Sequence, residues 1–209
     1  MDELVLSIEV GPHRLEARHQ PGAGKRSVVI CHPHSRYGGN LDNNVVLTAR
    51  DALAELGFGT LRFNFRGVGQ SGGRYADGLG EAEDLGPVFA ALVKREPGTV
   101  HLAAYSFGAW VALRATTDRV VSPATLMLFS PPVDFMPFDG LRLPDCPCLV
   151  VVGDRDGFCA LDSLEGWLRS QDQTALTRVV LPGVDHFYGG PQPGLTRAIT
   201  EFVTEFVTD

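Results

Sequence analysis

Residues 100–110 read VHLAAYSFGAW and hold the pattern that decides the fold. The apolar run TVHLAAY at 99–105 leads to Ser106 and is followed at once by the apolar stretch FGAWVALRAT. A strand that turns into a helix at a serine needs small residues two places before and after it, because strand and helix nearly touch there. Gly108 meets this requirement, while Ala104 stands where glycine is usual. Ser106 is therefore either a nucleophile in a strained turn or an ordinary helix-capping serine.

Further short apolar runs, flanked by Gly, Pro or polar residues, predict more buried strands. They are SVVICH (27–32), TLRFNF (60–65), ATLMLFS (124–130), CLVVVGD (148–154) and TRVVLPG (177–183). Helical patterns lie between the strands, at about 42–56, 80–94, 108–117, 160–170 and 194–207. Because continuous apolar strands alternate with amphipathic helices, we expect an α/β fold with a mostly parallel sheet and helices on both faces.

The N-terminal segment follows a different pattern. LVLSIEV, the turn residues GP and then HRLEARH predict an antiparallel hairpin at the sheet edge. We find no internal repeat, low-complexity tract or linker, so we expect residues 1–209 to form a single domain.

Composition and charge narrow the class of protein. The chain is 44% hydrophobic and 21% charged, which suits a soluble globular domain with a sizeable core. Its net charge of −7, with scattered basic residues, disfavours nucleic-acid and anionic-membrane partners. No apolar run approaches the roughly 20 residues that span a bilayer, and MDELVLSIEV does not read as a secretory signal. The four cysteines form no C-x-x-C or zinc pattern, so we expect a reduced, cytoplasmic protein.

Two candidate partners of Ser106 follow it at the ends of later strands. GDRDGF contains Asp156, and DHFYGG presents His186. Active sites of open parallel sheets lie at the carboxyl ends of strands, and a serine in such a turn is followed along the chain by its acid and then its histidine. We predict Ser106 as nucleophile, His186 as base and Asp156 as the acid that orients the imidazole. A solvent-facing loop position for His186 is the alternative.

Three other aspartates are alternatives for the acid. Asp154 lies closer to its strand and is expected to brace the turn. Asp134 follows the preceding strand and is a weaker candidate, and Asp185 adjoins His186, where its side chain would normally point away from the imidazole.

An acyl-transfer site also needs donors for the oxyanion. One is usually the N–H after the nucleophile, here that of Phe107. We predict the second to be the N–H of His34 in the loop CHPHSRYGGN, whose Gly38–Gly39 pair allows a sharp turn. The alternative for this loop is metal binding by His32 and His34, but it offers no third ligand at a suitable spacing, so we expect no metal.

Residues 67–72 match the dinucleotide pattern G-x-G-x-x-G directly after a strand. That pattern must open a helix, whereas GRYADGLG keeps the chain in a loop until about Gly80, so we reject a nucleotide role. Asn64 and Arg66 are expected to hold this glycine-rich loop in place; steering of an anionic substrate is the alternative for Arg66.

Taken together, these motifs resemble the α/β-hydrolase superfamily, and more narrowly its small, lidless, dienelactone-hydrolase-like group. The shared stretches are CHPHSRYGGNLDNNVV, LRFNFRGVGQSGG, GEAEDL, YSFGAWVALRA, GDRDGF and DHFYGG, in order across about residues 27–190. The resemblance implies Ser106, Asp156 and His186 as nucleophile, acid and base, with esterase-like activity on small acyl substrates. Members commonly carry glycine where Ala104 stands, which puts catalytic efficiency in question.

A short connection replaces the lid that this superfamily inserts. Only about 17 residues separate ATLMLFS from PCLVVVGD, so an open site and short substrates are expected. We predict Tyr37, Phe135 and Met136 as substrate-binding residues. Phe135 and Met136, with Phe138, could line an apolar acyl pocket or simply pack under the loop.

The leading hypothesis is a serine hydrolase, a carboxylesterase or thioesterase, that acts on a small acyl substrate without a cofactor. A small peptidase is a second enzymatic reading. A binding or scaffold protein that keeps the fold without catalysis is the alternative from another class. The acyl group, the leaving group and the oligomeric state stay open.

Overall fold

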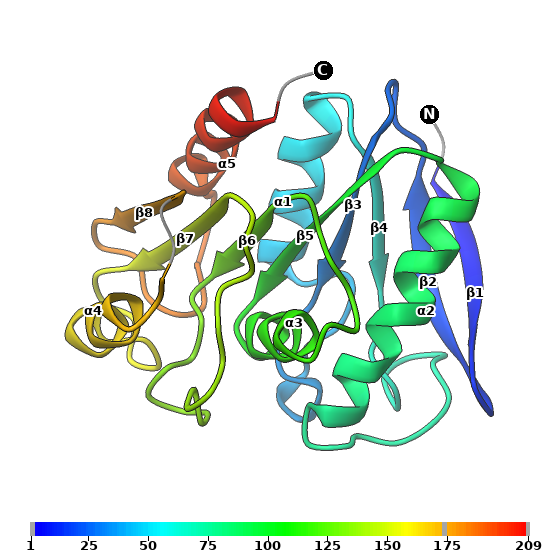
Figure 1. Ribbon diagram of the computed structural model, residues 1–209, viewed down its shortest axis with the longest axis horizontal. Coiled ribbons are helices and arrows are strands. Elements are labelled where there is room, and N and C mark those ends of the chain that lie inside the picture. Colours follow the sequence, from blue (N-terminus) through cyan, green and yellow to red (C-terminus); the bar gives the residue numbers. More distant parts are fainter. Residues whose placement is uncertain (1–2, 173–174, 208–209) are drawn as a thin grey trace.

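The computed structural model describes residues 3–172 and 175–207, in which the strands form one eight-stranded sheet (Figure 1). The strands are β1 (Leu4–Val10), β2 (His13–Gln20), β3 (Arg26–Cys31), β4 (Gly59–Phe63), β5 (Thr99–Tyr105), β6 (Leu126–Phe129), β7 (Cys148–Gly153) and β8 (Leu176–Leu181). Their order is β1-β2-β4-β3-β5-β6-β7-β8. β2 pairs antiparallel with β1 and β4, and all other neighbours are parallel. The predicted parallel sheet with an N-terminal hairpin at its edge is confirmed.

Helices cover both faces of the sheet, as predicted (Figure 1). They are α1 (Asn44–Glu55), α2 (Leu79–Arg95), α3 (Phe107–Thr117), α4 (Leu161–Arg169) and α5 (Pro193–Phe206), with the short 3-10 helix η1 (Ser35–Tyr37). α2, α3 and α4 pack on one face, and α1 and α5 pack on the other. No helix of the described residues is long and apolar enough to cross a membrane.

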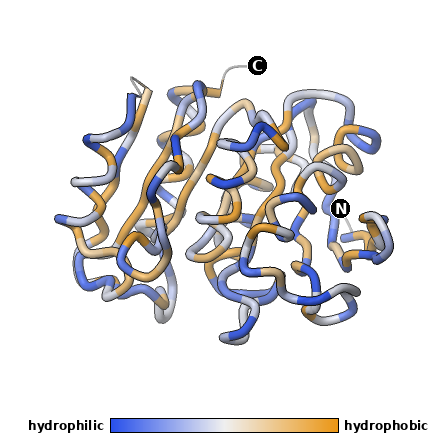
Figure 2. The backbone as a smooth tube through the Cα atoms, turned by 60° about the horizontal axis from the view of Figure 1, so that its bottom comes forward, coloured by the Kyte–Doolittle hydropathy of each residue, from blue (hydrophilic) through white to orange (hydrophobic). Residues whose placement is uncertain are grey.

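Alternation along the central strands builds two separate cores. In β3, Val28 and Ile30 pack under α1, whereas Val29 and Cys31 pack on the opposite face. Successive side chains of a strand point to opposite faces, so a strand buried on both sides must be apolar throughout. Figure 2 shows the result as hydrophobic stretches through the interior of the molecule. This explains why the central strands read as unbroken apolar runs.

The register of the sheet brings the ends of β3, β5 and β6 together. Ala104 pairs with Cys31 on one side and with Leu128 on the other. Just beyond, α3 crosses the end of β3 so closely that a Cβ on Gly108 would lie 2.6 Å from the carbonyl oxygen of His32. Real Cβ atoms are never found that near a backbone oxygen, so this crossing requires glycine.

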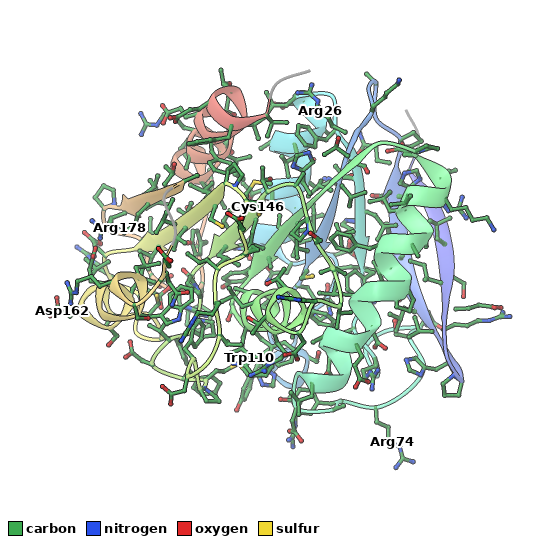
Figure 3. The ribbon with its side chains drawn as sticks, viewed as in Figure 1. Arg26, Arg74, Trp110, Cys146, Asp162 and Arg178 are labelled. Atoms are coloured by element: carbon green, nitrogen blue, oxygen red, sulfur yellow. The ribbon has the colours of Figure 1, made fainter. Side chains whose placement is uncertain are left out.

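The connection from β6 to β7 is fastened to α3. The Trp110 indole Nε1 donates to the carbonyl oxygen of Pro137 at 2.7 Å, and Figure 3 labels this side chain on α3. Arg142 N donates to Thr117 Oγ1 at 3.0 Å further along. Within residues 130–147 the structure contains no helix or strand, in line with the absence of a lid.

Substitution Gly108→Ala is expected to lower the free energy of unfolding by about 1–3 kcal/mol, because the added methyl must displace the backbone at His32. Gly166→Ala on α4 is the matched control. A Cβ there meets nothing within 4 Å, so helix propensity should raise stability by up to about 1 kcal/mol. Urea unfolding of both variants measures the effect. Equal stability of the two variants would contradict the close crossing.

Candidate active site

Ser106 occupies a strained turn between β5 and α3. Its φ of 54° and ψ of −121° lie in a region that non-glycine residues rarely adopt. Although Ser106 is the N-cap residue of α3, its side chain makes no capping hydrogen bond. Its Oγ instead lies 2.8 Å from Nε2 of His186. The helix-capping alternative for Ser106 is therefore wrong.

The structure brings the three predicted residues Ser106, His186 and Asp156 into one hydrogen-bonded chain. His186 Nδ1 lies 2.8 Å and 2.9 Å from the two carboxylate oxygens of Asp156. An ionised carboxylate can only accept, so the Nδ1–H group donates a hydrogen bond to Asp156. In the neutral imidazole, Nε2 then carries no proton and can accept the hydroxyl proton of Ser106. All three residues are buried, so His186 is not the solvent-facing loop residue of the alternative.

The other three aspartates hydrogen bond to backbone N–H groups of nearby loops. Asp154 Oδ1 accepts from Gly183 N at 2.7 Å, which braces the turn as expected. Asp134 Oδ2 accepts from the N–H of Ala160, and Asp185 Oδ1 accepts from the N–H that follows His186. Only Asp156 of the four hydrogen bonds to His186 in the described residues.

Two polar side chains that the sequence analysis missed hold the His186 loop. Tyr105 OH donates to the carbonyl oxygen of His186 at 2.5 Å. Asn44 Nδ2 donates to the carbonyl oxygens of Phe187 and Tyr188, at 2.9 Å and 2.8 Å. Tyr105 directly precedes Ser106, so one strand end positions both the serine and the histidine loop. The hydrogen bonds of Asn44 join residues more than 140 positions apart, so no local pattern in the sequence indicates them.

The two predicted oxyanion donors line the same cavity as Ser106. Phe107 is the first residue of α3, so its N–H has no acceptor within the helix. The N–H of His34 likewise makes no hydrogen bond to another described residue. The loop of His34 is closed by Gly39, whose N–H donates to the carbonyl oxygen of His34 at 3.1 Å. A Cβ on Gly39 would lie 2.2 Å from the carbonyl oxygen of Pro33, so this turn also requires glycine.

His32 fixes the backbone just before His34. Its Nε2 accepts from Phe65 N at 3.0 Å, so its Nδ1 carries the proton and donates to the carbonyl oxygen of Pro33 at 2.6 Å. Burial lowers the pKa of His32 to about 4, which keeps the ring neutral. Both ring nitrogens are thus occupied. The described residues contain no group of metal-ligating side chains, and the metal-binding alternative for His32 and His34 finds no support there.

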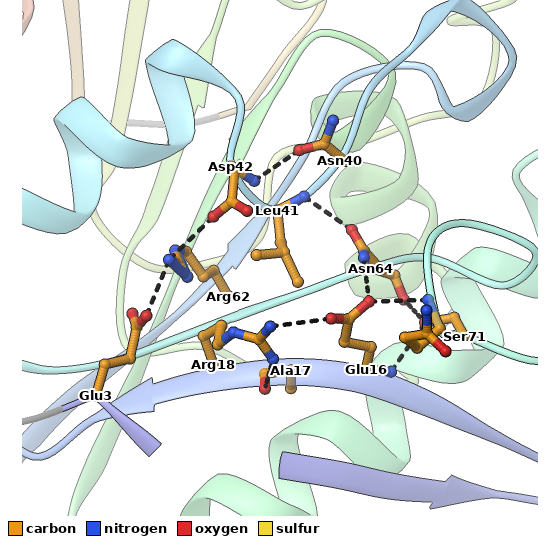
Figure 4. Close-up of polar contacts among 11 residues, drawn as sticks. Glu3, Glu16, Ala17, Arg18, Asn40, Leu41, Asp42, Arg62, Asn64 and Ser71 are labelled. Carbon is orange, nitrogen blue, oxygen red and sulfur yellow. Dashed lines mark hydrogen bonds and ion pairs between the residues drawn. The ribbon is translucent and has the colours of Figure 1, made fainter. Parts of the chain in front are cut away.

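The glycine-rich loop after β4 is held by side chains. Asn64 Oδ1 accepts from Leu41 N at 2.8 Å and its Nδ2 donates to Glu16 at 2.8 Å, which Figure 4 shows. Arg66 forms two hydrogen bonds with the buried carboxylate of Asp84, and this contact raises the pKa of Arg66. Between the end of β4 and Leu79 the chain forms no helix. A dinucleotide site would need a helix directly after the glycine pattern, so its rejection agrees with the structure. Arg66 faces Asp84 and is not among the residues that line the cavity, which favours the structural interpretation over substrate steering.

A cavity of about 530 Å³ opens beside Ser106 and is mostly apolar. The predicted substrate-binding residues Tyr37, Phe135 and Met136 all line it. Phe138 does not: it is buried, with its ring 5.2 Å from that of Trp167. The sequence analysis missed Phe158 and Phe187, which line the cavity from the loops that carry the acid and the histidine. The other lining residues include Pro33, His34, Gly38, Gly39, Asn43, Tyr105, Phe107 and Pro132.

Known proteins share this architecture. No protein-family model matches the chain. An uncharacterised protein from Rickettsia prowazekii is 30% identical over an alignment of 205 residues, and the match covers 92% of this chain and 86% of that protein. The crystal structure of a lidless α/β serine hydrolase from Xanthomonas campestris is 31% identical, with a TM-score of 0.91, over 100% of this chain and 96% of the other. An α/β serine hydrolase homologue from Coxiella burnetii is 33% identical, with a TM-score of 0.87, over 95% and 96% of the two chains.

The chain belongs to the lidless α/β serine hydrolases. This membership supports hydrolase activity of a general kind. It also agrees with the fold: the connection between β6 and β7, where a lid would stand, contains no helix or strand and carries Phe135 and Met136 into the cavity wall.

Because His32 is buried in its neutral form, we expect this hydrolase to be less stable towards unfolding in mild acid. Its pKa is about 4 when folded and about 6.5 when unfolded, so the unfolded chain binds more protons between these values. The free energy of unfolding should therefore fall as pH drops from about 7 to about 4.5, with His32 contributing on the order of 3 kcal/mol.

Urea unfolding of the wild type and of His32→Asn, at about pH 7 and about pH 4.5, measures this contribution. The variant should lose less stability over the interval, whatever its stability at pH 7. His101 is also buried with a pKa of about 4, and it is retained in both proteins. The same pH dependence in both would show that His32 protonates freely in the folded state.

Proposed function

We propose that this protein is a carboxylesterase or thioesterase that hydrolyses small acyl substrates through Ser106. The observation that carries the proposal is the unbroken hydrogen-bonded chain from Ser106 through His186 to Asp156, at the wall of an apolar cavity. A serine hydroxyl is a weak nucleophile at neutral pH, and a base within hydrogen-bond reach that is itself oriented by an acid activates it.

In the acylation step, Ser106 Oγ attacks the carbonyl carbon of the substrate while His186 Nε2 takes the hydroxyl proton. Asp156 accepts from Nδ1 and stabilises the imidazolium that forms. The N–H groups of Phe107 and His34 would donate to the oxyanion of the tetrahedral intermediate. When that intermediate collapses, the bond to the leaving oxygen or sulfur breaks, and the leaving group takes the proton from Nε2. The acyl group then remains on Ser106.

In the second step, water attacks the acyl carbonyl and passes a proton to His186 Nε2. Collapse of this intermediate breaks the bond between Ser106 Oγ and the acyl carbon, and Oγ regains the proton. The free acid leaves. Each proton in both steps moves through one nitrogen, which is why the orientation of His186 by Asp156 matters.

We further propose that the substrate is a small molecule and that the protein acts in the cytoplasm. Tyr37, Phe135 and Met136 would contact the substrate from the cavity wall. Cys31 and Cys159 are buried thiols, as is common in proteins of reducing compartments.

Labelling with a fluorophosphonate, alongside turnover of p-nitrophenyl acetate and butyrate, tests the proposal. Wild type should be labelled and should hydrolyse both esters. Ser106→Ala should lose the label and at least about 10³-fold in kcat/KM, because the nucleophile is gone. Ser163→Ala, at an exposed position of α4, should behave as wild type. Folded wild-type protein that neither labels nor turns over would favour a non-catalytic binding protein.

A further inference from the structure

Five side chains form a continuous arc of rings along the cavity wall. This aromatic arc consists of His34, Tyr37, Phe135, Phe158 and Phe187, all of which line the cavity. Successive ring centroids along it lie 4.8, 6.3, 5.5 and 6.1 Å apart. Its members come from three separate loops, after β3, β6 and β7, and from the loop of His186. The arc is thus a product of the fold and not of one local segment.

The arc borders the reacting groups. The ring of Phe158 lies 4.6 Å from that of His186, and the ring of Phe187 lies 5.8 Å from it. At the other end, His34 carries the proposed oxyanion donor, and its ring lies 4.6 Å from that of Phe107. A group attached close to the scissile carbonyl would therefore meet aromatic rings.

Three rings of the arc are open to solvent. Tyr37 is 76% exposed, Phe187 is 66% exposed and Phe135 is 49% exposed. Large apolar side chains gathered at the rim of a concave site usually mark a surface that a ligand covers. Phe135 belongs to the connection from β6 to β7, which itself forms part of the cavity wall.

The cavity offers no charge to a substrate. None of the described residues that line it is Asp, Glu, Lys or Arg. Arg36, in the loop after β3, does not line the cavity, and its guanidinium lies over the ring of Tyr75 at 5.6 Å. An ionised group placed in such a cavity would lose hydration without gaining a partner. The site therefore suits a neutral group.

The arrangement of the rings distinguishes aromatic from aliphatic groups. Neighbouring rings stand at steep angles: 65° for Tyr37 with Phe135, 80° for Phe135 with Phe158, and 85° for Phe158 with Phe187. A planar group that stacks on one of these rings therefore stands at a steep angle to the next ring along the arc. A planar aromatic group can make edge-to-face and offset contacts with both, and such pairs gain more than buried area alone provides.

We propose that this site selects neutral esters or thioesters that carry an aryl or arylalkyl group beside the scissile bond. The inference rests on the proposed function, because it assigns the substrate class of the same site. It adds that the aromatic arc, and Phe135 and Phe187 in particular, sets specificity.

Two pairs of esters that differ only in ring saturation test the inference. Methyl phenylacetate is compared with methyl cyclohexylacetate for the acyl side, and benzyl acetate with cyclohexylmethyl acetate for the alcohol side. Each kcat/KM is divided by the rate of hydroxide hydrolysis. The cyclohexyl compound of each pair is the more hydrophobic, so simple apolar burial favours it. We expect the aryl ester of at least one pair to be preferred by roughly 3- to 10-fold, the range of aromatic pair energies.

Matched variants connect this preference to the arc. Phe135→Leu and Phe187→Leu keep an apolar side chain but remove the ring, and each should bring the ratio of aryl to cyclohexyl turnover towards one. Phe206→Leu at the end of α5 is the control, because Phe206 does not line the cavity, and it should keep the wild-type ratio.

A binding measurement separates failure of this inference from failure of the proposed function. Ser106→Ala can be titrated with the same four esters by NMR, since no turnover is needed. Tighter binding of the aryl esters supports the inference even if wild type hydrolyses nothing. The inference is overturned if wild type hydrolyses the cyclohexyl ester of both pairs as fast as the aryl ester or faster. If wild type hydrolyses nothing, equal binding of the aryl and cyclohexyl esters to Ser106→Ala overturns it. A preference that persists in both leucine variants also overturns the role of the arc.

Discussion

The close crossing of α3 over the end of β3 is the constraint on which the site depends. At Gly108 the helix comes so near the carbonyl oxygen of His32 that no side chain fits between them. The crossing sets the strained turn at Ser106 and places the first turn of α3 beside the loop that follows β3. Phe107 and His34 therefore line one cavity with Ser106, although they come from separate parts of the chain. A wider crossing would separate the nucleophile from both predicted oxyanion donors.

Two buried side chains of the site, Asp156 and His32, have hydrogen-bond partners for their polar atoms. The Asp156 carboxylate is fully buried, and it accepts from His186 and from the N–H of Phe158. His32 is buried too, and both of its nitrogens are hydrogen bonded. Unpaired groups of this kind would cost several kcal/mol each, so these contacts are conditions for folding as well as for orientation. The site is thus organised before any substrate arrives, and preorganised dipoles of this kind are what stabilise a developing oxyanion.

The sequence was sufficient for the fold and for choosing three residues that the structure brings together, because both leave local signals. Unbroken apolar runs identified the central strands, and Ser106, Asp156 and His186 each follow a strand in chain order. Side chains that act across the fold left no such signal. Asn44 reaches the carbonyl of Phe187, 143 positions away, and Tyr105 reads as one more apolar strand residue. Phe158 was likewise overlooked, because its contact with the ring of His186 depends on how two loops meet.

The central claim is that acyl transfer passes through Ser106. Mass spectrometry of the protein, rapidly quenched during turnover of a p-nitrophenyl ester, tests this most directly. A good leaving group makes the first step fast, so the second step limits the rate and the acyl-enzyme accumulates. We predict one added acyl group, located on the peptide that contains Ser106. Hydrolysis of the ester with no acyl group on that peptide, or with the group on another residue, would contradict the account.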